Sequence, residues 1–423
     1  MKRRIVVLLV LAMAAPAVLF ASGAEEAAAP AGPVTLRFAV WDQATTVYLQ
    51  PMVDAFMAKN SRIKIQFVDT AANDYPDRWA VLLAGGDTTD LISIKDMPGY
   101  AGMATRNQIL DLTPYITRDK YNLGQYSGLT NEFTVDGKLY SLPFRSDIWI
   151  LYYNKSLFDK AGVPYPTNDM TWQQYFDLAK RMTSGSGAAK VYGGHHHTWR
   201  STTQLATVQD GRHTVIADDY SFMKWMYELM IKAQAEGTIM DWASQRAGNL
   251  HYRSLFYNQQ FAMMPMGTWQ IATQIAAKTK GDAPFEWGIV KFPHPPGVPA
   301  GTTAGNFTGV SINARSANKD AAWEFLKSFC GPEGADILVG LGQIPAGRTP
   351  EILAKIAAKE GFPAGGAAAL ETVTVRLEAP YHPQLAAIEQ ILNEEHELIL
   401  TGGKSIDAGL ADMGRRVKAL LGR

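Results

Sequence analysis

The sequence contains one cysteine, Cys330, among 423 residues, so no disulfide can form within the chain. Charge of one sign is not in excess either, because 40 Lys and Arg side chains balance 40 Asp and Glu. Such a chain has no strong field to attract nucleic acid or an anionic membrane, and we expect neither as a partner. The nucleophile elbow Gly-x-Ser-x-Gly, the zinc motif His-Glu-x-x-His and the phosphate-binding loop are also missing, which argues against the enzymes that carry them.

Hydrophobic runs long enough to span a bilayer are missing as well. The longest apolar stretch, residues 5–20, covers about 16 residues where a membrane span needs ~20. Basic residues precede it and small residues follow it, which is typical of a cleaved secretory signal. We therefore expect a signal peptide over residues 1–23, a disordered Ala/Glu/Pro-rich linker over residues 24–33, and a periplasmic or extracytoplasmic location. No cysteine follows the apolar stretch, so an acylated-cysteine anchor is not expected.

The hydrophobic content of 47% is that of an ordinary globular protein, and the length favours two domains. Residues 34–40 alternate apolar and polar side chains, a helical pattern follows, and residues 63–67 alternate again. This order predicts a parallel sheet, whose ligands bind beyond the carboxyl ends of the strands. Trp41, Asp42 and Gln43 follow the first predicted strand, and Asp96 follows the third.

Residues 136–154 combine a turn signal, a proline, polar residues and a β-branched, aromatic run. The run, residues 148–153, is short enough to be a buried strand. Arg145 and Asp147 stand between Pro143 and this strand, where polar side chains need a role. We predict a hinge strand between two lobes, with its polar residues facing a cleft.

Three adjacent histidines, residues 195–197, raise the question of a metal site. Neighbouring side chains point in different directions, and no further His, Asp or Glu lies nearby at ligand spacing. We therefore expect a loop that lines a polar pocket with Trp199, and no metal ion. Trp269 lies between a predicted strand and a helix, where one ring face can point into a cleft.

Several short segments also follow one another in a distinctive order. They are Tyr153-Asn154 with Phe158 and Ala161-Gly162, the Thr171-Trp172 helix cap, residues 261–264 with Gly267-Thr268-Trp269, residues 316–319 with residues 322–326, and Ile344-Pro345-Ala346. In this order, behind a signal peptide, they resemble the family 1 extracellular solute-binding proteins, the maltose-binding-like receptors of bacterial ABC importers. The resemblance covers about residues 34–421.

The resemblance implies an α/β, two-lobed periplasmic binding protein fold of type II, in which three inter-lobe crossovers bend to close the lobes on ligand. The implied N-terminal lobe is residues 34–144 and 306–345, the C-terminal lobe residues 148–304 and 350–421, and the hinge crossings lie near residues 143–148, 291–306 and 344–350. Position by position, it implies a ligand-binding acid at Asp147, a sugar-stacking tryptophan at Trp269, and a cleft loop around residues 196–199.

The expected function is capture of a mono- or oligosaccharide and its delivery to the membrane permease of an ABC importer. Aromatic faces suit the apolar faces of sugars, and polar side chains suit their hydroxyls. We expect a monomer without a cofactor. The candidate ligand-binding residues are Trp41, Asp42, Gln43, Asp96, Arg145, Asp147, His197, Trp199, Trp269, Asn306 and Tyr381.

Two alternatives stay open. A secreted carbohydrate-active hydrolase needs two carboxylates about 5–10 Å apart, and Asp42 with Asp147 could supply them. A receptor for a metal ion could use residues 195–197, and one for an anionic ligand such as a sugar phosphate could use Arg145. An ion pair between Arg145 and Asp147 within the hinge is equally compatible with the sequence.

Overall fold

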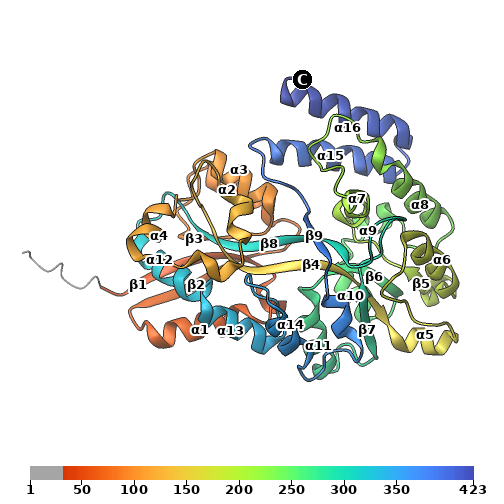
Figure 1. The fold of residues 1–423 in the computed structure, drawn as a ribbon, viewed down its shortest axis with the longest axis horizontal. Coiled ribbons are helices and arrows are strands. Elements are labelled where there is room, and N and C mark those ends of the chain that lie inside the picture. The colour runs from red at the N-terminus through yellow and green to blue at the C-terminus, as the bar shows by residue number, and fades with distance from the viewer. Residues whose placement is uncertain (1–31) are drawn as a thin grey trace, which may run out of the picture.

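The computed structural model describes residues 32–423, and Figure 1 shows two α/β lobes side by side. The expected signal peptide, residues 1–23, and residues 24–31 of the expected linker lie outside the described residues. No helix within residues 32–423 has both the length and the apolar character to cross a membrane.

The first lobe is built on a sheet in which β1 (Val34–Trp41) pairs in parallel with β2 (Ile63–Thr70) and β3 (Leu91–Ile94). The predicted parallel opening of the sheet is therefore confirmed. Alternate residues of β1 enter the core, where the Phe38 ring packs edge-on against Phe325, with centroids 5.5 Å apart. The helices of this lobe are α1 (Leu49–Lys59), α2 (Tyr75–Ala84), α3 (Met97–Thr105), α4 (Thr113–Asp119), α12 (Lys319–Phe329) and α13 (Pro332–Leu341).

The second lobe is built on the last part of β4 (Leu142–Asn154), which pairs antiparallel with both β6 (Phe261–Gly267) and β7 (Trp287–Lys291). A short strand, β5 (Tyr192–Gly194), extends the sheet beyond β6. The predicted helix cap at Thr171 is confirmed, since Thr171 and Gln174 form a capping box that begins α6. The helices are α5 (Lys155–Ala161), α6 (Trp172–Met182), α7 (Ser201–Val208), α8 (Lys224–Ala235), α9 (Trp242–Ala247), α10 (Tyr252–Tyr257), α11 (Gln270–Lys280), α14 (Pro350–Ala357), α15 (Leu385–Leu400) and α16 (Ile406–Leu421).

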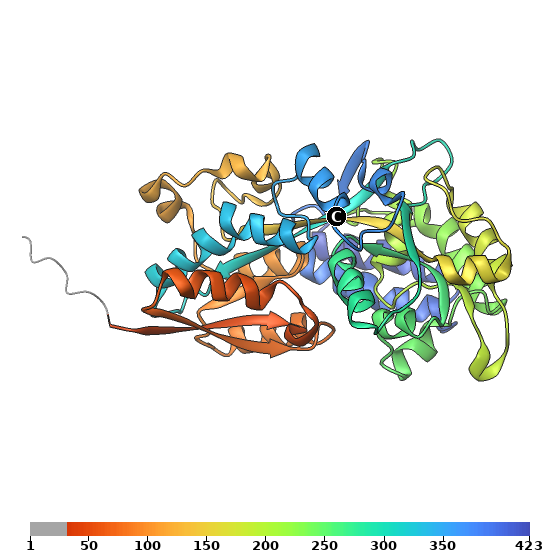
Figure 2. The ribbon, with the colours of Figure 1, turned by 90° about the horizontal axis from the view of Figure 1, so that it is seen from below.

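Three chain segments join the lobes. Strands β4 and β8 (Thr302–Ile312) run antiparallel through the middle of the molecule, with Arg145 opposite Thr308 and Asp147 opposite Asn306 (Figures 1 and 2). The third segment crosses beside them, where Pro345 bridges to Arg145 and Ala346 N donates to Phe144 O at 2.9 Å. The strand predicted to pass between the lobes is thus β4, at the centre of the fold.

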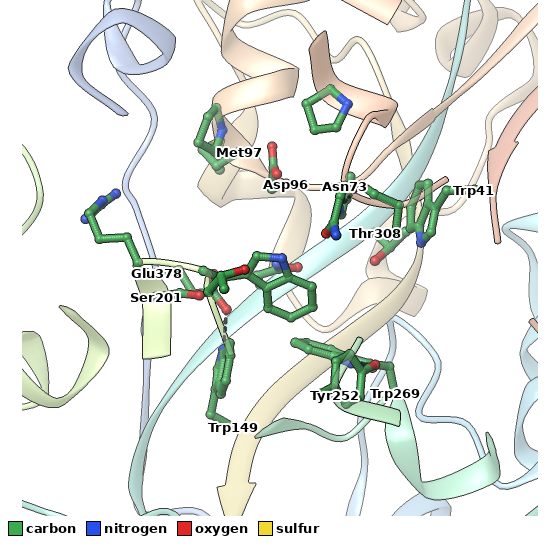
Figure 3. A pocket seen from close by; sticks show the side chains of 18 of the residues that line it. Trp41, Asn73, Asp96, Met97, Trp149, Ser201, Tyr252, Trp269, Thr308 and Glu378 are labelled. Carbon is green, nitrogen blue, oxygen red and sulfur yellow. Dashed lines mark hydrogen bonds between the residues drawn. The ribbon is translucent and has the colours of Figure 1, made fainter. Parts of the chain in front are cut away.

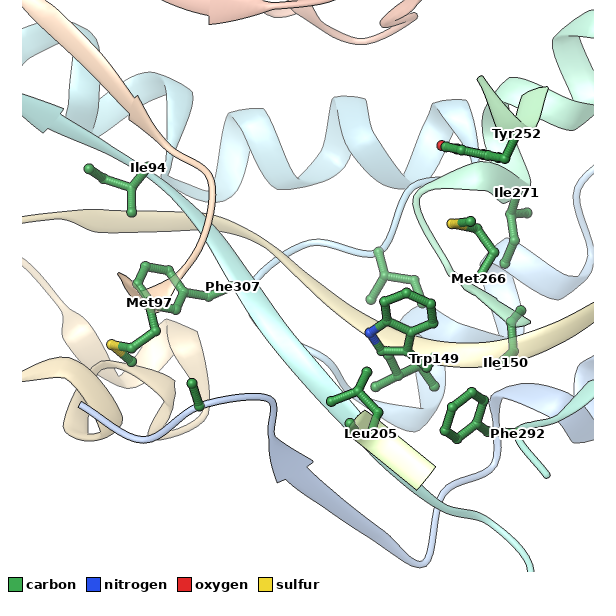
Figure 4. Packing of buried hydrophobic residues seen from close by; sticks show 14 of the residues in the cluster. Ile94, Met97, Trp149, Ile150, Leu205, Tyr252, Met266, Ile271, Phe292 and Phe307 are labelled. Carbon is green, nitrogen blue, oxygen red and sulfur yellow. The ribbon is translucent and has the colours of Figure 1, made fainter. Parts of the chain in front are cut away.

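Strand β8 begins earlier than the sequence suggests. Residues 293–305 are Pro/Gly-rich and predict a connector, but the strand starts at Thr302. Pairing overrides local composition there, because β9 (Thr374–Leu377) runs parallel to residues 302–305 and the Thr303 hydroxyl donates to Trp149 O at 2.6 Å. Buried side chains fill the space on both sides of these central strands (Figure 4).

Candidate functional site

A cavity of about 460 Å³ lies between the two lobes, against the central strands β4 and β8 (Figure 3). Its first wall comes from the residues that follow β1, β2 and β3, as expected for the carboxyl ends of parallel strands. Its second wall comes from the loop before α7 and from α9, α10, β9 and α15. The volume lies in the range of small-molecule sites, about 300–1,000 Å³.

Four aromatic side chains of the second lobe, Trp149, Trp199, Tyr252 and Trp269, form what we call the aromatic wall. Trp269 meets Trp149 edge-on, with centroids 5.4 Å apart, and its Nε1 donates to the Tyr252 hydroxyl at 3.2 Å. Trp199 lies 6.2 Å from Trp269, centroid to centroid. Flat apolar faces with polar edges are thereby held at fixed angles toward the cavity (Figure 3).

Gly267 lets the Trp269 ring turn back over the end of β6. A Cβ at this position would lie 2.0 Å from the indole, which real Cβ contacts do not allow. Because Gly267 has no side chain, the Trp269 ring can fold back over it and point toward the cavity.

The opposite wall carries Trp41 and a group of charged residues. Asp42 holds the loop after β1 to the loop after β2, because its Oδ1 accepts from Ala72 N at 2.9 Å. The Lys95 ammonium donates to Ala72 O at 2.6 Å and lies 6.0 Å from the Trp41 ring and 5.8 Å from the Trp199 ring. Burial lowers the pKa of Lys95, against the opposing effect of the Asp96 and Asp42 carboxylates.

Arg145 and Asp147 form a buried ion pair at the base of the cavity, with Arg145 Nε 2.7 Å from Asp147 Oδ2. The other guanidinium nitrogens donate to the Tyr48 hydroxyl at 3.0 Å and to Thr308 Oγ1 at 3.1 Å. Thr268 Oγ1 donates to the second Asp147 oxygen at 2.9 Å. The charge of Arg145 is therefore neutralised within the protein, which removes the main support for an anionic ligand.

The three histidines form a layer behind the aromatic wall. His197 is 2% exposed and meets Trp199 edge-on at 4.5 Å, while His195 stacks on Phe261 at 4.4 Å. Burial lowers the pKa of His195 to about 3 and that of His196 to about 4, so both rings are neutral at pH 7. Within residues 32–423, no group of three His, Cys, Asp or Glu side chains is placed to hold a metal ion.

Sequence reasoning missed several residues that reach the cavity. Glu378 follows β9, and its carboxyl accepts a hydrogen bond from Trp149 Nε1. Burial, together with the nearby carboxylates of Asp96 and Glu389, raises the pKa of Glu378 to about 7. Arg200, also at the cavity, pairs with Glu389 of α15. No motif marks these positions, because β9 is only four residues long and α15 shows only an amphipathic pattern.

The structure brings seven of the eleven predicted site residues to the cavity and leaves four outside its lining. Gln43 lies in the short helical turn after β1, where its N–H donates to Asp69 Oδ1 at 3.1 Å. Asp147 and His197 lie beneath the lining, and the Tyr381 ring packs against Tyr100, 6.3 Å away. The seven residues at the cavity are Trp41, Asp42, Asp96, Arg145, Trp199, Trp269 and Asn306.

Known proteins resemble the chain both in sequence and in fold. A sugar transporter of Rhizobium etli, solved in an open conformation, is 45% identical and superposes with a TM-score of 0.72, over 91% of this chain and 99% of that one. The lactose-binding protein of Rhizobium radiobacter is 24% identical over 71% of each chain. The sn-glycerol-3-phosphate-binding periplasmic protein of Agrobacterium fabrum is 41% identical over only 71 residues, 17% of this chain and 16% of its own length.

A family model described as bacterial extracellular solute-binding protein matches residues 42–336, well over half of the chain. That span contains the first two connecting segments, β4 and β8, and most of the cavity lining. The match agrees with the two-lobed fold and with the cavity between the lobes. The protein belongs to the bacterial extracellular solute-binding protein family.

Proposed function

We propose that this protein is the extracytoplasmic solute-binding component of an ABC importer and that it captures a carbohydrate between its lobes. The observation that carries the proposal is the aromatic wall facing a cavity that polar side chains of both lobes also line. Aromatic faces bind the apolar faces of sugar rings, and carboxylates, amides and guanidinium groups bind their hydroxyls. The Rhizobium etli relative is called a sugar transporter and the Rhizobium radiobacter relative a lactose-binding protein, which supports this choice.

Closure of the lobes is the second part of the proposal. The segments near residues 143–148, 291–306 and 344–350 act as the hinge between a lobe of residues 34–144 and 306–345 and a lobe of residues 148–304 and 350–421. Ligand shifts the open–closed equilibrium by its difference in affinity for the two forms. The closed monomer is then the form that docks on the membrane permease.

The hydrolase alternative loses the carboxylate pair on which it depended. Asp147 is 1% exposed, and its two carboxylate oxygens are bound by Arg145 and Thr268, so it cannot reach a glycosidic bond in the cavity. A thermal-shift panel of neutral mono- and oligosaccharides, polyols, glycerol phosphates and divalent ions tests the proposal. We expect stabilisation by at least one carbohydrate and no release of cleaved sugar. Stabilisation by metal ions or phosphate esters alone would overturn the proposal.

Trp269→Ala is expected to weaken carbohydrate binding by roughly 1–3 kcal/mol, the scale of a buried aromatic contact. The Trp269 ring supports both Trp149 and Tyr252, so its loss also loosens the wall. Isothermal titration calorimetry with the sugar found in the panel measures the change. Trp225→Ala on α8, outside the cavity lining, is the control and should bind like the parent protein. Equal affinity in the two variants would assign Trp269 to packing alone.

A further inference from the structure

One corner of the cavity is rich in hydrogen-bond acceptors. It is formed by Asp96 at the start of α3, Gln204 on α7 and Glu378 after β9, and we call it the acceptor corner. Figure 3 shows Asp96 and Glu378 among the side chains that line the cavity, with Ser201 beside Glu378. Gln204 and Glu378 are neighbours, because Gln204 Nε2 donates to Glu378 O at 3.1 Å.

One of these acceptors lacks a donor in the described chain, and a second receives only one. Gln204 is 3% exposed, and its Oε1 has no hydrogen-bond partner within residues 32–423. In the same residues, the Asp96 carboxyl receives one hydrogen bond, from Gly99 N to Oδ1 at 2.9 Å, which caps α3. A buried acceptor without a donor is unfavourable, so a ligand that brings a donor to Gln204 Oε1 gains affinity.

The carboxyl groups of Asp96 and Glu378 form no salt bridge within residues 32–423, so neither has a directly paired cation that stabilises its charged form. Burial and the nearby Glu389 raise the pKa of Asp96, and Asp96 in turn helps to raise that of Glu378. The cations nearby are engaged elsewhere: Arg200 pairs with Glu389 and donates to Asn393, while Lys95 donates to Ala72 O. Lys95 offsets the charge of Asp96 in part, and Glu378 keeps carboxylate neighbours on two sides.

We propose that the acceptor corner binds a protonated amine of the ligand, so that the cleft selects carbohydrates with a basic nitrogen, such as amino sugars. The inference rests on the proposed function, because it names the class of sugar that the same cavity takes. An ammonium group offers three hydrogen-bond donors and a positive charge, and it can therefore serve as the cationic partner of Asp96 and Glu378. The indoles of Trp149 and Trp199 add rings on which a cation is favourable.

The same corner fits the rest of an amino sugar. Arg200 Nη1 is buried without a partner in the described chain, although the remainder of its guanidinium is engaged. An amino sugar carries a hydroxyl on the carbon next to its amine, and that oxygen can accept from Arg200. The corner therefore supplies acceptors for the amine and a donor for the neighbouring hydroxyl.

Calorimetric titration at pH 7 tests the proposal with three sugars that differ only at carbon 2 and with one anionic sugar that differs from glucose only at carbon 6. The probes are glucosamine, N-acetylglucosamine, glucose and glucuronate, together with β-1,4-linked disaccharides that carry the same four groups. We expect the free amine to bind at least about tenfold more tightly than the acetylated and neutral sugars, a difference of about 1.4 kcal/mol. The uronate should bind most weakly.

Three variants locate the preference. Glu378→Gln keeps an acceptor for Trp149 Nε1, and Asp96→Asn keeps a residue that caps helices well. Both should abolish the preference for the amine, which is measured within each variant as the ratio of its affinities for the amine and the neutral sugar. Glu371→Gln removes an exposed carboxylate that precedes β9, outside the cavity lining, and should leave the preference intact.

The outcomes separate this inference from the proposed function. Equal binding of amine and neutral sugars, or an amine preference that survives Glu378→Gln, would overturn the amine site and leave a carbohydrate receptor. Absence of binding by any carbohydrate would overturn the proposed function, and the amine site with it.

Discussion

Asp147→Ala is expected to lower the free energy of unfolding by about 3–5 kcal/mol, the cost of breaking a buried ion pair by removing one partner. Arg145 would remain at 7% exposure, bound to the Tyr48 and Thr308 hydroxyls but without a carboxylate. Both residues lie on β4 between the lobes, so the unpaired charge would destabilise the central strands of the fold. Urea denaturation followed by circular dichroism measures it.

A double variant tests whether the loss of stability comes from the unpaired charge of Arg145. Arg145→Met with Asp147→Asn removes both charges, and the amide oxygen that replaces the carboxylate can still accept from the Thr268 hydroxyl. We expect the double variant to recover at least about half of the lost stability, because no unpaired charge stays buried. A loss below about 1 kcal/mol in Asp147→Ala would show that the ion pair with Arg145 contributes little to stability and would contradict this prediction.

Acidification from pH 7 to pH 5 is expected to destabilise the protein strongly, because four buried histidines, His195, His196, His197 and His396, must stay neutral. Burial lowers the pKa of His195 and His396 to about 3 and that of His196 to about 4. The unfolded chain binds protons near pH 6.5, so stability falls as pH drops below that value toward the folded pKa. Each histidine contributes about 2 kcal/mol to the loss at pH 5.

Glu378 opposes this trend on a smaller scale. Its pKa of about 7 lies above that of an unfolded glutamate, so the folded state takes up its proton first as the pH falls. Guanidinium denaturation at pH 7, 6 and 5 measures the net change in the free energy of unfolding. His195→Phe, which keeps the stacking on Phe261, should flatten the pH dependence, whereas His213→Gln at an exposed position should not. Equal stability at pH 7 and pH 5 would contradict the account.

Much of the fold was predictable because local sequence patterns determine its main helices and strands. The alternation in β1, the capping box of α6 and the aromatic run in β4 each predict the element that forms. The start of β8 was not predictable, because pairing with β9, some 70 residues later, overrides its local Pro/Gly context.

The candidate site was predictable only in part. Polar residues after strands point to a cleft, but sequence cannot say which side chains pair with one another. Arg145 and Asp147 neutralise each other, and His197 lies behind the Trp199 ring. Glu378 reaches the cavity through a short strand whose position depends on the whole fold. Contacts between residues distant in sequence, rather than local pattern, decide these roles.

Small-angle X-ray scattering with and without saturating ligand tests the central claim most directly. The sugar is the one that gives the largest thermal shift in the panel. If carbohydrate binds between the lobes and closes them about β4, β8 and the third segment, the radius of gyration must decrease on saturation. A sugar that binds and leaves the radius of gyration unchanged would contradict capture by lobe closure.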